Sequence, residues 1–217
     1  NAEWTPIGNS ANKFQGTFDG NNKTISNLVI TGNKSDVGLF GMTTNGEIKN
    51  LTVNNAKVSG YLDVAVVAGT PYTSKYTNIT VKGHIEVNGM AYVGGVGGKN
   101  AYANWTNVTV DVDEDSYVHA NSVENGTAYR TYVGGVVGYK ENNATVKNCS
   151  NYGLVSNNLS YTGGVIGYAV GQSTDFSGLF NYAPVNGAKH TAGIVGYNKQ
   201  TEIKNSDNYG YVKGTSY

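Results

Sequence analysis

Three tyrosines are spaced so regularly that together they could form a binding surface. Tyr139, Tyr168 and Tyr197 each directly follow a Gly-apolar-apolar-Gly block, and they stand at equal intervals along the chain. Tyrosine joins a flat apolar ring to a polar tip, so an exposed column of such rings can bind sugars or a protein partner. Stacking between repeats, which only stabilises the fold, is the alternative that we favour. A second set with the same two interpretations is Tyr152, Tyr182 and Tyr209.

Acidic residues concentrate at one place in the chain. Asp111, Asp113 and Asp115 occupy alternate positions, which on a strand would project from one face. Carboxylate oxygens grouped in this way are the ligands that calcium prefers. The stretch lacks the glycine and the distant glutamate of an EF-hand loop, and acidic stretches are usually solvated. We therefore consider a calcium site here as the alternative to a solvated turn, and we expect no other cofactor.

The side chains needed for catalysis show no convergent spacing. A zinc peptidase needs two histidines one helical turn apart with a glutamate between them, but the three histidines of this chain stand far apart in strand-like sequence. Glycoside hydrolysis needs two facing carboxylates, and the acidic residues outside the cluster show no recurrent pairing. We predict that the chain is not an enzyme. The alternative is a carbohydrate-active enzyme, a polysaccharide lyase or a glycoside hydrolase, on the same fold.

An internal repeat supplies the elements that position these residues. The Gly-apolar-apolar-Gly blocks cover residues 38–41, 65–68, 95–98, 135–138, 164–167 and 193–196, and their last residues are 27, 30, 40, 29 and 29 positions apart. A second motif, apolar-x-Asn-x-x-apolar, contains Asn27, Asn50, Asn78, Asn107, Asn148 and Asn205, and Gly178 replaces the asparagine in one further copy. Two separate motifs that keep one period indicate a repeated structural unit.

The repeat predicts a solenoid of β-strands. Short stretches alternate apolar and polar residues, which is typical of strands with one buried face. Glycine and asparagine between them supply turns with positive φ, and glycine also lets neighbouring backbones approach closely. One such repeat cannot bury its apolar face, but stacked repeats enclose a continuous core. We therefore expect an all-β fold, a parallel β-helix of about seven coils with roughly 29 residues each.

Composition argues against several classes of partner. The 217 residues carry 15 basic and 15 acidic side chains, and Arg130 is the only arginine. Nucleic acid is therefore not an expected partner. The single cysteine, Cys149, rules out a disulfide within the chain. No apolar stretch approaches the roughly 18 residues that a spanning helix needs, so we expect no membrane insertion by this chain.

The blocks resemble the GLUG-motif repeat family, which is named for a Gly-Leu-apolar-Gly core. Residues 38–41 match that core literally, and the opening Trp4-Thr5-Pro6-Ile7-Gly8 resembles the segment that begins such arrays. The resemblance implies a right-handed parallel β-helix on secreted or surface-anchored bacterial proteins, many of them adhesin-like. It also implies that the motif is structural and carries no catalytic residue.

The fourth repeat departs from the pattern because its spacing stretches to 40 residues. We predict a single domain over residues 1–217, a fragment of a larger protein, with an inserted arm over residues 111–132. The arm contains His119 and Arg130, which we add to the candidate binding residues. The sequence thus predicts a non-catalytic extracellular or cell-surface module of a bacterial protein, adhesive or serving as a spacer. Its expected partner is a host or microbial glycan or a surface protein.

Overall fold

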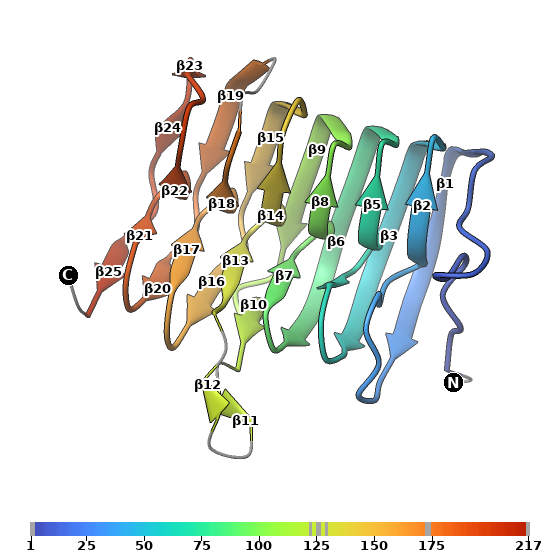
Figure 1. Cartoon of the computed structure of the whole chain (residues 1–217), viewed down its shortest axis with the longest axis horizontal. Helices are drawn as coiled ribbons and strands as arrows, with labels where there is room; N and C mark the ends of the chain where they lie inside the picture. The colour runs from blue at the N-terminus through green and yellow to red at the C-terminus, as the bar shows by residue number, and fades with distance from the viewer. Residues whose placement is uncertain (1–2, 122, 125–126, 129, 172–174, 216–217) are drawn as a thin grey trace.

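The computed structural model describes residues 3–121, 123–124, 127–128, 130–171 and 175–215. In these residues the chain contains strands and turns and no helix, and the strands stack in parallel along one axis (Figure 1). The predicted parallel β-solenoid is therefore confirmed.

A twelve-stranded sheet forms one side of the solenoid, and we call it the back sheet. In the first coils each of its strands is long and continuous, as in β1 (Thr17–Ile30), β3 (Glu47–Ser59) and β6 (Lys75–Gly89). From the fourth coil onward the strand is broken into pieces. These are β9 (Asn104–Val112) with β10 (Tyr117–Ala120), β15 (Thr145–Asn151) with β16 (Leu154–Asn157), β19 (Asp175–Asn181) with β20 (Val185–Gly187), and β23 (Ile203–Lys204), β24 (Asp207–Asn208) and β25 (Val212–Gly214).

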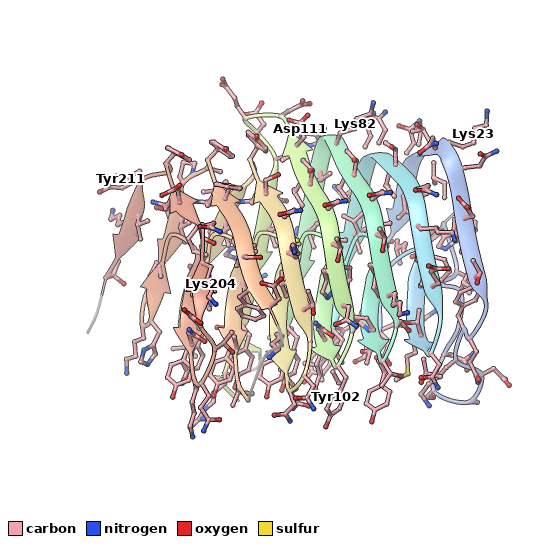
Figure 2. The ribbon with its side chains drawn as sticks, turned by 90° about the horizontal axis from the view of Figure 1, so that it is seen from above. Lys23, Lys82, Tyr102, Asp111, Lys204 and Tyr211 are labelled. Carbon is pink, nitrogen blue, oxygen red and sulfur yellow. The ribbon has the colours of Figure 1, made fainter. Side chains whose placement is uncertain are left out.

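Two smaller sheets form the front of the solenoid. The lower front sheet contains β4 (Val64–Ala65), β7 (Tyr92–Gly94), β13 (Tyr132–Gly134), β17 (Tyr161–Gly163) and β21 (Thr191–Ala192). The upper front sheet contains β2 (Phe40–Thr44), β5 (Ala68–Tyr72), β8 (Gly97–Ala101), β14 (Val137–Glu141), β18 (Ile166–Ala169) and β22 (Val195–Asn198). In Figure 2 the front of the molecule carries Tyr102, whereas Lys23, Lys82 and Asp111 project on the opposite side.

The solenoid has about six coils in its described residues, not seven, since six strands make up the upper front sheet. The opening segment accounts for the difference. It pairs with the first coil only through single bridges, Ile7 with Phe40 and Phe14 with Thr43, before β1 begins. It therefore closes the end of the solenoid without completing a coil.

One apolar core fills the space between the back and front sheets. A single cluster of buried side chains runs through it from Leu28 to Val195. Its largest members are Trp105 and Tyr76, whose rings stack with centroids 4.1 Å apart and planes inclined by 16°. Burial of this continuous core is the main stabilising contribution, because no single coil could cover its own apolar face.

Glycines of the Gly-apolar-apolar-Gly block permit contact between successive coils. A Cβ atom added to Gly167 would lie 2.5 Å from the oxygen of Gly138 and within 2.7 Å of the nitrogen and oxygen of Val133. The predicted close approach is thus confirmed. The predicted positive φ is wrong for these glycines, since the described glycines with positive φ all lie elsewhere. Strand register also shows that Gly69, not Ala68, is the structural equivalent of Gly41.

The asparagines of the second motif form a ladder on the surface of the back sheet, the outer asparagine ladder. The side-chain nitrogen of Asn78 donates to the side-chain oxygen of Asn50, and Asn107 donates to Asn78, both at 3.0 Å. These residues have φ between 52° and 56°, a region that asparagine tolerates better than most residues. Gly178 takes this position in a later coil with φ of 64°. Asn27 belongs to a different column, since it contacts Asn55.

Strand register divides the insertion of the fourth coil into two parts. Ala120 pairs with Gly89 and Tyr132 pairs with Tyr92, so residues 121–131 occupy the place of two residues in the preceding coil. This arm contains the antiparallel pair β11 (Val123–Glu124) and β12 (Thr127–Ala128) (Figure 1). The smaller part lies at 113–116. Residues 117–120 between the parts form β10 of the back sheet, so the arm is narrower than residues 111–132.

Candidate functional site

Tyr139, Tyr168 and Tyr197 form a stacked column on the upper front sheet, which we call the upper column. Parallel pairing of β14, β18 and β22 places the three residues in register. The ring centroids of Tyr139 and Tyr168 are 5.2 Å apart with planes inclined by 5°, and those of Tyr168 and Tyr197 are 4.7 Å apart at 7°. The column that the equal intervals between these tyrosines predicted is therefore present.

A second column, the lower column, lies beside it on the lower front sheet and is missing from the sequence predictions. Tyr132 stacks on Tyr92 at 5.1 Å and on Tyr161 at 5.3 Å, and His190 stacks on Tyr161 at 4.7 Å. The sequence does contain a signal for this column. An aromatic residue stands two positions before the Gly-Gly pair in Tyr92-Val93-Gly94-Gly95 and in its copies at 132–135 and 161–164.

The two columns interlock into one surface, which we call the tyrosine strip. Rings of one column contact rings of the other edge to face, for example Tyr132 with Tyr139 at 5.0 Å and 71°, and Tyr161 with Tyr168 at 4.9 Å and 76°. Because stacked neighbours within a column cover the ring faces, the strip presents mainly ring edges and hydroxyl groups. Each edge-to-face or stacked pair adds roughly 0.5–1.5 kcal/mol beyond burial, so the strip also stabilises the coils.

Charged side chains border the tyrosine strip. The ammonium group of Lys99 lies 5.2 Å from the ring centroid of Tyr92, and the hydroxyl of Tyr139 donates to Glu141 at 3.1 Å. Burial, and then the neighbouring Tyr92, raise the pKa of Tyr132, while the positive charge of Arg130 acts in the opposite direction. Burial also raises the pKa of Tyr139. The phenols of Tyr132 and Tyr139 are therefore neutral hydrogen-bond donors over the physiological pH range.

Two carboxylates continue the lower column toward the N-terminal end. Val37, Val64 and Val93 are in register, which places Asp36 and Asp63 in line with Tyr92. Burial, followed by repulsion from Asp36, raises the pKa of Asp63 to about 7, and Lys99 opposes this shift. One side-chain oxygen of Asp63 is buried and has no hydrogen-bond partner in the described structure. The strip thus ends at a carboxyl group that is partly protonated near neutral pH.

The candidate binding residues of the arm lie in two different places. Arg130 acts electrostatically on Tyr132 and Tyr168, so it belongs to the border of the tyrosine strip. His119 lies on β10 in the back sheet, where its ring nitrogens contact the Ser156 hydroxyl at 2.8 Å and the Asn121 side chain at 3.2 Å. The structure therefore brings Arg130, but not His119, to the tyrosines.

The acidic cluster does not have the geometry that alternation predicts. Asp111 lies near the end of β9, whereas Asp113 and Asp115 lie in the turn that follows, so the three side chains do not project from one strand face. Within the described ranges, no group of three or more histidine, cysteine, aspartate or glutamate side chains converges as a metal site. Calcium binding by this segment stays a prediction that rests on the sequence alone.

Tyr152, Tyr182 and Tyr209 form a third column, the back column, where the strands of the back sheet are broken. Their ring centroids are 4.4 and 5.0 Å apart, and the planes are inclined by 7° and 9°. The three side chains are 42%, 41% and 64% exposed, so this column is the most accessible of the three.

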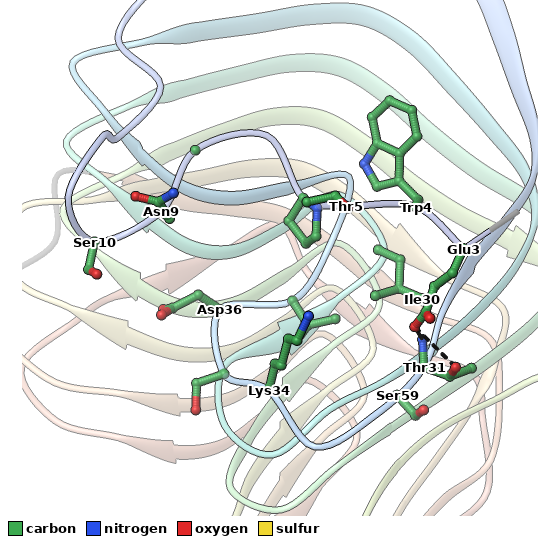
Figure 3. A pocket seen from close by; sticks show the side chains of 14 residues that line it. Glu3, Trp4, Thr5, Asn9, Ser10, Ile30, Thr31, Lys34, Asp36 and Ser59 are labelled. Carbon is green, nitrogen blue, oxygen red and sulfur yellow. Dashed lines mark hydrogen bonds between the residues drawn. The ribbon is translucent and has the colours of Figure 1, made fainter.

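A cavity of about 450 Å³ lies where the opening segment closes the end of the solenoid (Figure 3). Trp4, Lys34 and Asp36 contribute to its lining, and Glu3 is fixed at its side by hydrogen bonds from the Thr31 amide and hydroxyl, at 2.7 and 3.1 Å. Its size is that of a small-ligand pocket. Asp36 connects this cavity to the N-terminal end of the tyrosine strip.

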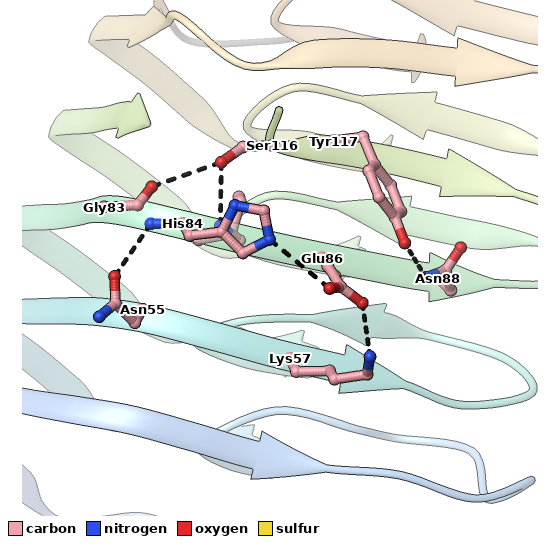
Figure 4. A network of polar contacts seen from close by, with 9 residues as sticks. Asn55, Lys57, Gly83, His84, Glu86, Asn88, Ser116 and Tyr117 are labelled. Atoms are coloured by element: carbon pink, nitrogen blue, oxygen red, sulfur yellow. Dashed lines mark hydrogen bonds and ion pairs between the residues drawn. The ribbon is translucent and has the colours of Figure 1, made fainter. Parts of the chain in front are cut away.

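A polar network on the back sheet supplies hydrogen-bond acceptors for backbone amides where β6 is irregular (Figure 4). The register of β3 and β6 shifts after Asn54, which leaves His84 opposite Asn55. The side-chain oxygen of Asn55 accepts the His84 amide at 2.9 Å, and the Ser116 hydroxyl accepts the next amide at 3.0 Å. Glu86 contacts His84 at 3.5 Å and Lys57 at 2.7 Å. This network therefore has a structural role.

Comparison with known proteins gives one partial likeness. A stretch of 102 residues is 45% identical to Halomucin from Haloquadratum walsbyi (strain DSM 16790 / HBSQ001), which covers 45% of this chain and 1% of Halomucin. The chain thus spans about one hundredth of the length of that relative. No protein-family model and no solved structure matches the chain. The resemblance to the GLUG-motif family therefore stays a prediction from the motifs. In the described residues, no helix is long and apolar enough to cross a bilayer.

Proposed function

We propose that the chain is a non-catalytic extracellular binding module of a bacterial surface protein, and that its tyrosine strip holds a long polysaccharide. The strip itself carries this proposal. It consists of seven aromatic rings on four successive coils, and its six phenols repeat at the spacing of the coils. A surface that repeats along a rod suits a ligand that also repeats.

Hydrogen bonds from the phenols, and not stacking on their faces, would hold the sugar. Neighbouring rings cover the ring faces within each column, and the raised pKa values of Tyr132 and Tyr139 keep these two hydroxyls protonated. Coils of a parallel solenoid are about 4.8 Å apart, so an extended chain lying along the axis would make a similar contact with each coil. Contacts that are weak singly add up when one ligand binds them together.

The likeness to a protein named Halomucin supports an extracellular or cell-surface location for this chain. The stretch in common covers nearly half of the chain. A stiff rod with a binding strip would serve there as an adhesive or spacer segment.

A glycan array, followed by affinity electrophoresis with the polysaccharides that score, tests this proposal. Tyr168→Phe, Tyr139→Phe and Tyr197→Phe together remove three hydroxyls of the strip while keeping the rings that stack. We expect the triple variant to lose at least about tenfold in affinity, equivalent to about 1.4 kcal/mol. The matched control is Tyr152→Phe with Tyr182→Phe in the back column, which should bind as the parent does. Unchanged binding by the strip variant would contradict the proposal.

One observation favours an alternative, a polysaccharide hydrolase. A general acid needs a pKa near neutrality, and Asp63 has a pKa of about 7 and lies close to a second carboxylate, Asp36. Release of reducing ends from a bound polysaccharide, abolished by Asp63→Asn, would support this alternative. Absence of release from every polysaccharide that binds would remove it.

A further inference from the structure

The back column holds exposed tyrosine rings face to face between successive coils. The amide of Tyr152 donates to the oxygen of Val110, and the amide of Tyr182 donates to the oxygen of Asn151, so the two residues occupy the same place in consecutive coils. Their rings are nearly parallel with centroids 4.4 Å apart, the shortest tyrosine–tyrosine separation among the described rings. In-register stacking of this kind places the two phenol rings side by side.

Accessibility separates this column from the tyrosine strip. Tyr152 and Tyr182 are 42% and 41% exposed, so an oxidant in solution can reach both phenols. In the strip, each ring contacts a nearly perpendicular neighbour, as Tyr139 does with Tyr132. Such contacts oppose the ring rotation that is needed to form a covalent bond between two tyrosines. Among the described rings, those that contact the back column are inclined to it by 28° or less, so none stands perpendicular to it.

Two other oxidisable side chains, Cys149 and Trp105, are buried and compete little with the back column. Cys149 is fully buried, and burial raises the pKa of its thiol to about 12, which suppresses the reactive thiolate. Trp105 is also fully buried. The other tryptophan, Trp4, is 40% exposed, but it lies in the opening segment at the N-terminal end of the solenoid, away from the late coils. In the late coils, a one-electron oxidant in solution therefore meets exposed tyrosines first.

We propose that the back column is a site of oxidative cross-linking, in which Tyr152 and Tyr182 become a dityrosine that ties two successive coils. A haem peroxidase with hydrogen peroxide is the class of oxidant required. Each phenol loses one electron and one proton, and the two phenoxyl radicals form a carbon–carbon bond between the positions next to their oxygens. The hydrogens on those two carbons then move to the oxygens, which restores both phenols. One hydrogen peroxide is reduced to two waters, and the protein loses two hydrogen atoms.

Such a bond would act as a disulfide does. The chain contains one cysteine and forms no disulfide within itself. A covalent link between residues 152 and 182 closes a loop of one coil and restricts the unfolded chain. The cross-linked solenoid would unfold more slowly than the reduced one. This inference is independent of ligand binding by the tyrosine strip.

The test treats the purified chain at low concentration with a haem peroxidase and hydrogen peroxide. We expect a monomer that has lost two hydrogen atoms, dityrosine fluorescence, and after proteolysis a cross-linked peptide pair containing residues 152 and 182. Tyr182→Phe keeps the ring and should lower the intramolecular yield at least fivefold. Tyr211→Phe is the control, because Tyr211 is 69% exposed and belongs to none of the stacked pairs in the described structure.

Three results would overturn the proposal. These are dityrosine found only between molecules, a yield unaffected by Tyr182→Phe, and a link that maps to other tyrosines. A second measurement addresses the consequence of the link. The half-life of unfolding in denaturant should lengthen after oxidation of the parent and of Tyr211→Phe, but not after oxidation of Tyr182→Phe.

Discussion

The first coils and the last coils of the solenoid differ at one interior position, which lies between the back strand and the front turn. Where the middle of the back strand faces the front turn, an early coil has buried valines on both sides, Val81 on the back strand and Val66 on the front, and the next coil has Val110 with Gly95. The late coils place asparagine on the back strand and glycine on the front. These pairs are Asn151 with Gly135, Asn181 with Gly164, and Asn208 with Gly193.

The asparagines of the late coils form a second ladder, the inner asparagine ladder. Asn151 donates to Asn181 at 2.9 Å, and Asn181 donates to Asn208 at 2.8 Å. Each side chain also binds the turn that follows it, as Asn151 does with the oxygen of Gly153 at 2.8 Å. Glycine on the front is required because any Cβ atom at Gly164 would overlap the Asn181 side chain.

The difference shows that the residue at this interior position determines whether the back strand continues and which side chain lies on the surface next to it. An apolar pair lets the back strand continue, so that β6 runs unbroken past Val81. An inward asparagine binds its own turn and breaks the strand, and the residue after it is then turned outward. In the late coils this residue is Tyr152, Tyr182 or Tyr209, so the back column exists only where the inner asparagine ladder does.

The largest effect should come from filling the glycine position of a late coil. Gly164→Val would place atoms against the backbone oxygen of Gly193 and the side chain of Asn181, neither of which can withdraw without disrupting the ladder. We expect a loss of about 4 kcal/mol or more in the free energy of unfolding, or failure to fold. Denaturant unfolding measures it. The control is Val66→Ala in an early coil, with a smaller loss of about 2 kcal/mol. Equal losses would refute the distinction between the two kinds of coil.

Removal of one rung of the inner asparagine ladder should have the next largest effect. Asn181→Ala takes away the acceptor of Asn151 and the donor to Asn208 and to the oxygen of Ala183, and so leaves the Ala183 oxygen and one amide hydrogen of the buried Asn151 without these partners. The expected loss is about 3 kcal/mol, since each unsatisfied buried group costs about 1–3 kcal/mol. Hydrogen exchange should show greater loss of protection in the late coils than in the early ones. Protection lost equally throughout would mean that the ladder does not act locally.

A pH dependence should arise in the early coils, where Asp63 occupies the place of a strip tyrosine. Its pKa is about 7 in the folded protein, against about 3.9 in an unfolded chain. Between these values the folded protein binds a proton that the unfolded chain has released, so stability falls as the pH rises from about 4 to 7 and levels off above. Asp63→Asn should reduce this fall and raise the melting temperature at pH 8. An unchanged slope between pH 4 and 7 would contradict the assignment to Asp63.

The smallest effect concerns the outer asparagine ladder, which early and late coils have in common. Asn78→Gly removes two solvent-exposed side-chain hydrogen bonds, to Asn50 and from Asn107, but keeps a residue suited to φ of 55°, so a loss of about 1 kcal/mol is expected. Asn78→Ala adds the strain of positive φ, for a total of about 2 kcal/mol. Denaturant unfolding of the two variants side by side measures the difference. Equal losses would show that backbone conformation does not matter at this position.

The upper column was predictable because strand pairing is parallel and the period is regular. Since equal intervals separate Tyr139, Tyr168 and Tyr197, stacked coils must place the three rings in line. The lower column carries the same kind of signal, but its intervals are unequal because the arm separates Tyr92 from Tyr132. Spacing alone therefore revealed a column only where no insertion interrupts it.

Register is the part of the fold that local sequence described least well. Asn27 matches the second motif as well as Asn50 does, yet its partner across the strands is Asn55. Ala68 ends a recognisable block, but the equivalent of Gly41 is Gly69. A motif of four residues tolerates a shift by one position, whereas pairing along β1, β3 and β6 involves many residues at once and admits one alignment.

By itself the sequence determined that the chain is a solenoid, because a period of apolar and turn residues specifies one coil and requires that coils stack to bury their apolar faces. It also determined which residues would recur in columns. Tertiary structure decided which columns lie next to one another. Tyr132 and Tyr139 are close in sequence but belong to different sheets, and their rings meet only because the intervening glycines let the two front sheets approach. Contacts between columns depend on the angle between sheets, and packing of the whole coil sets that angle.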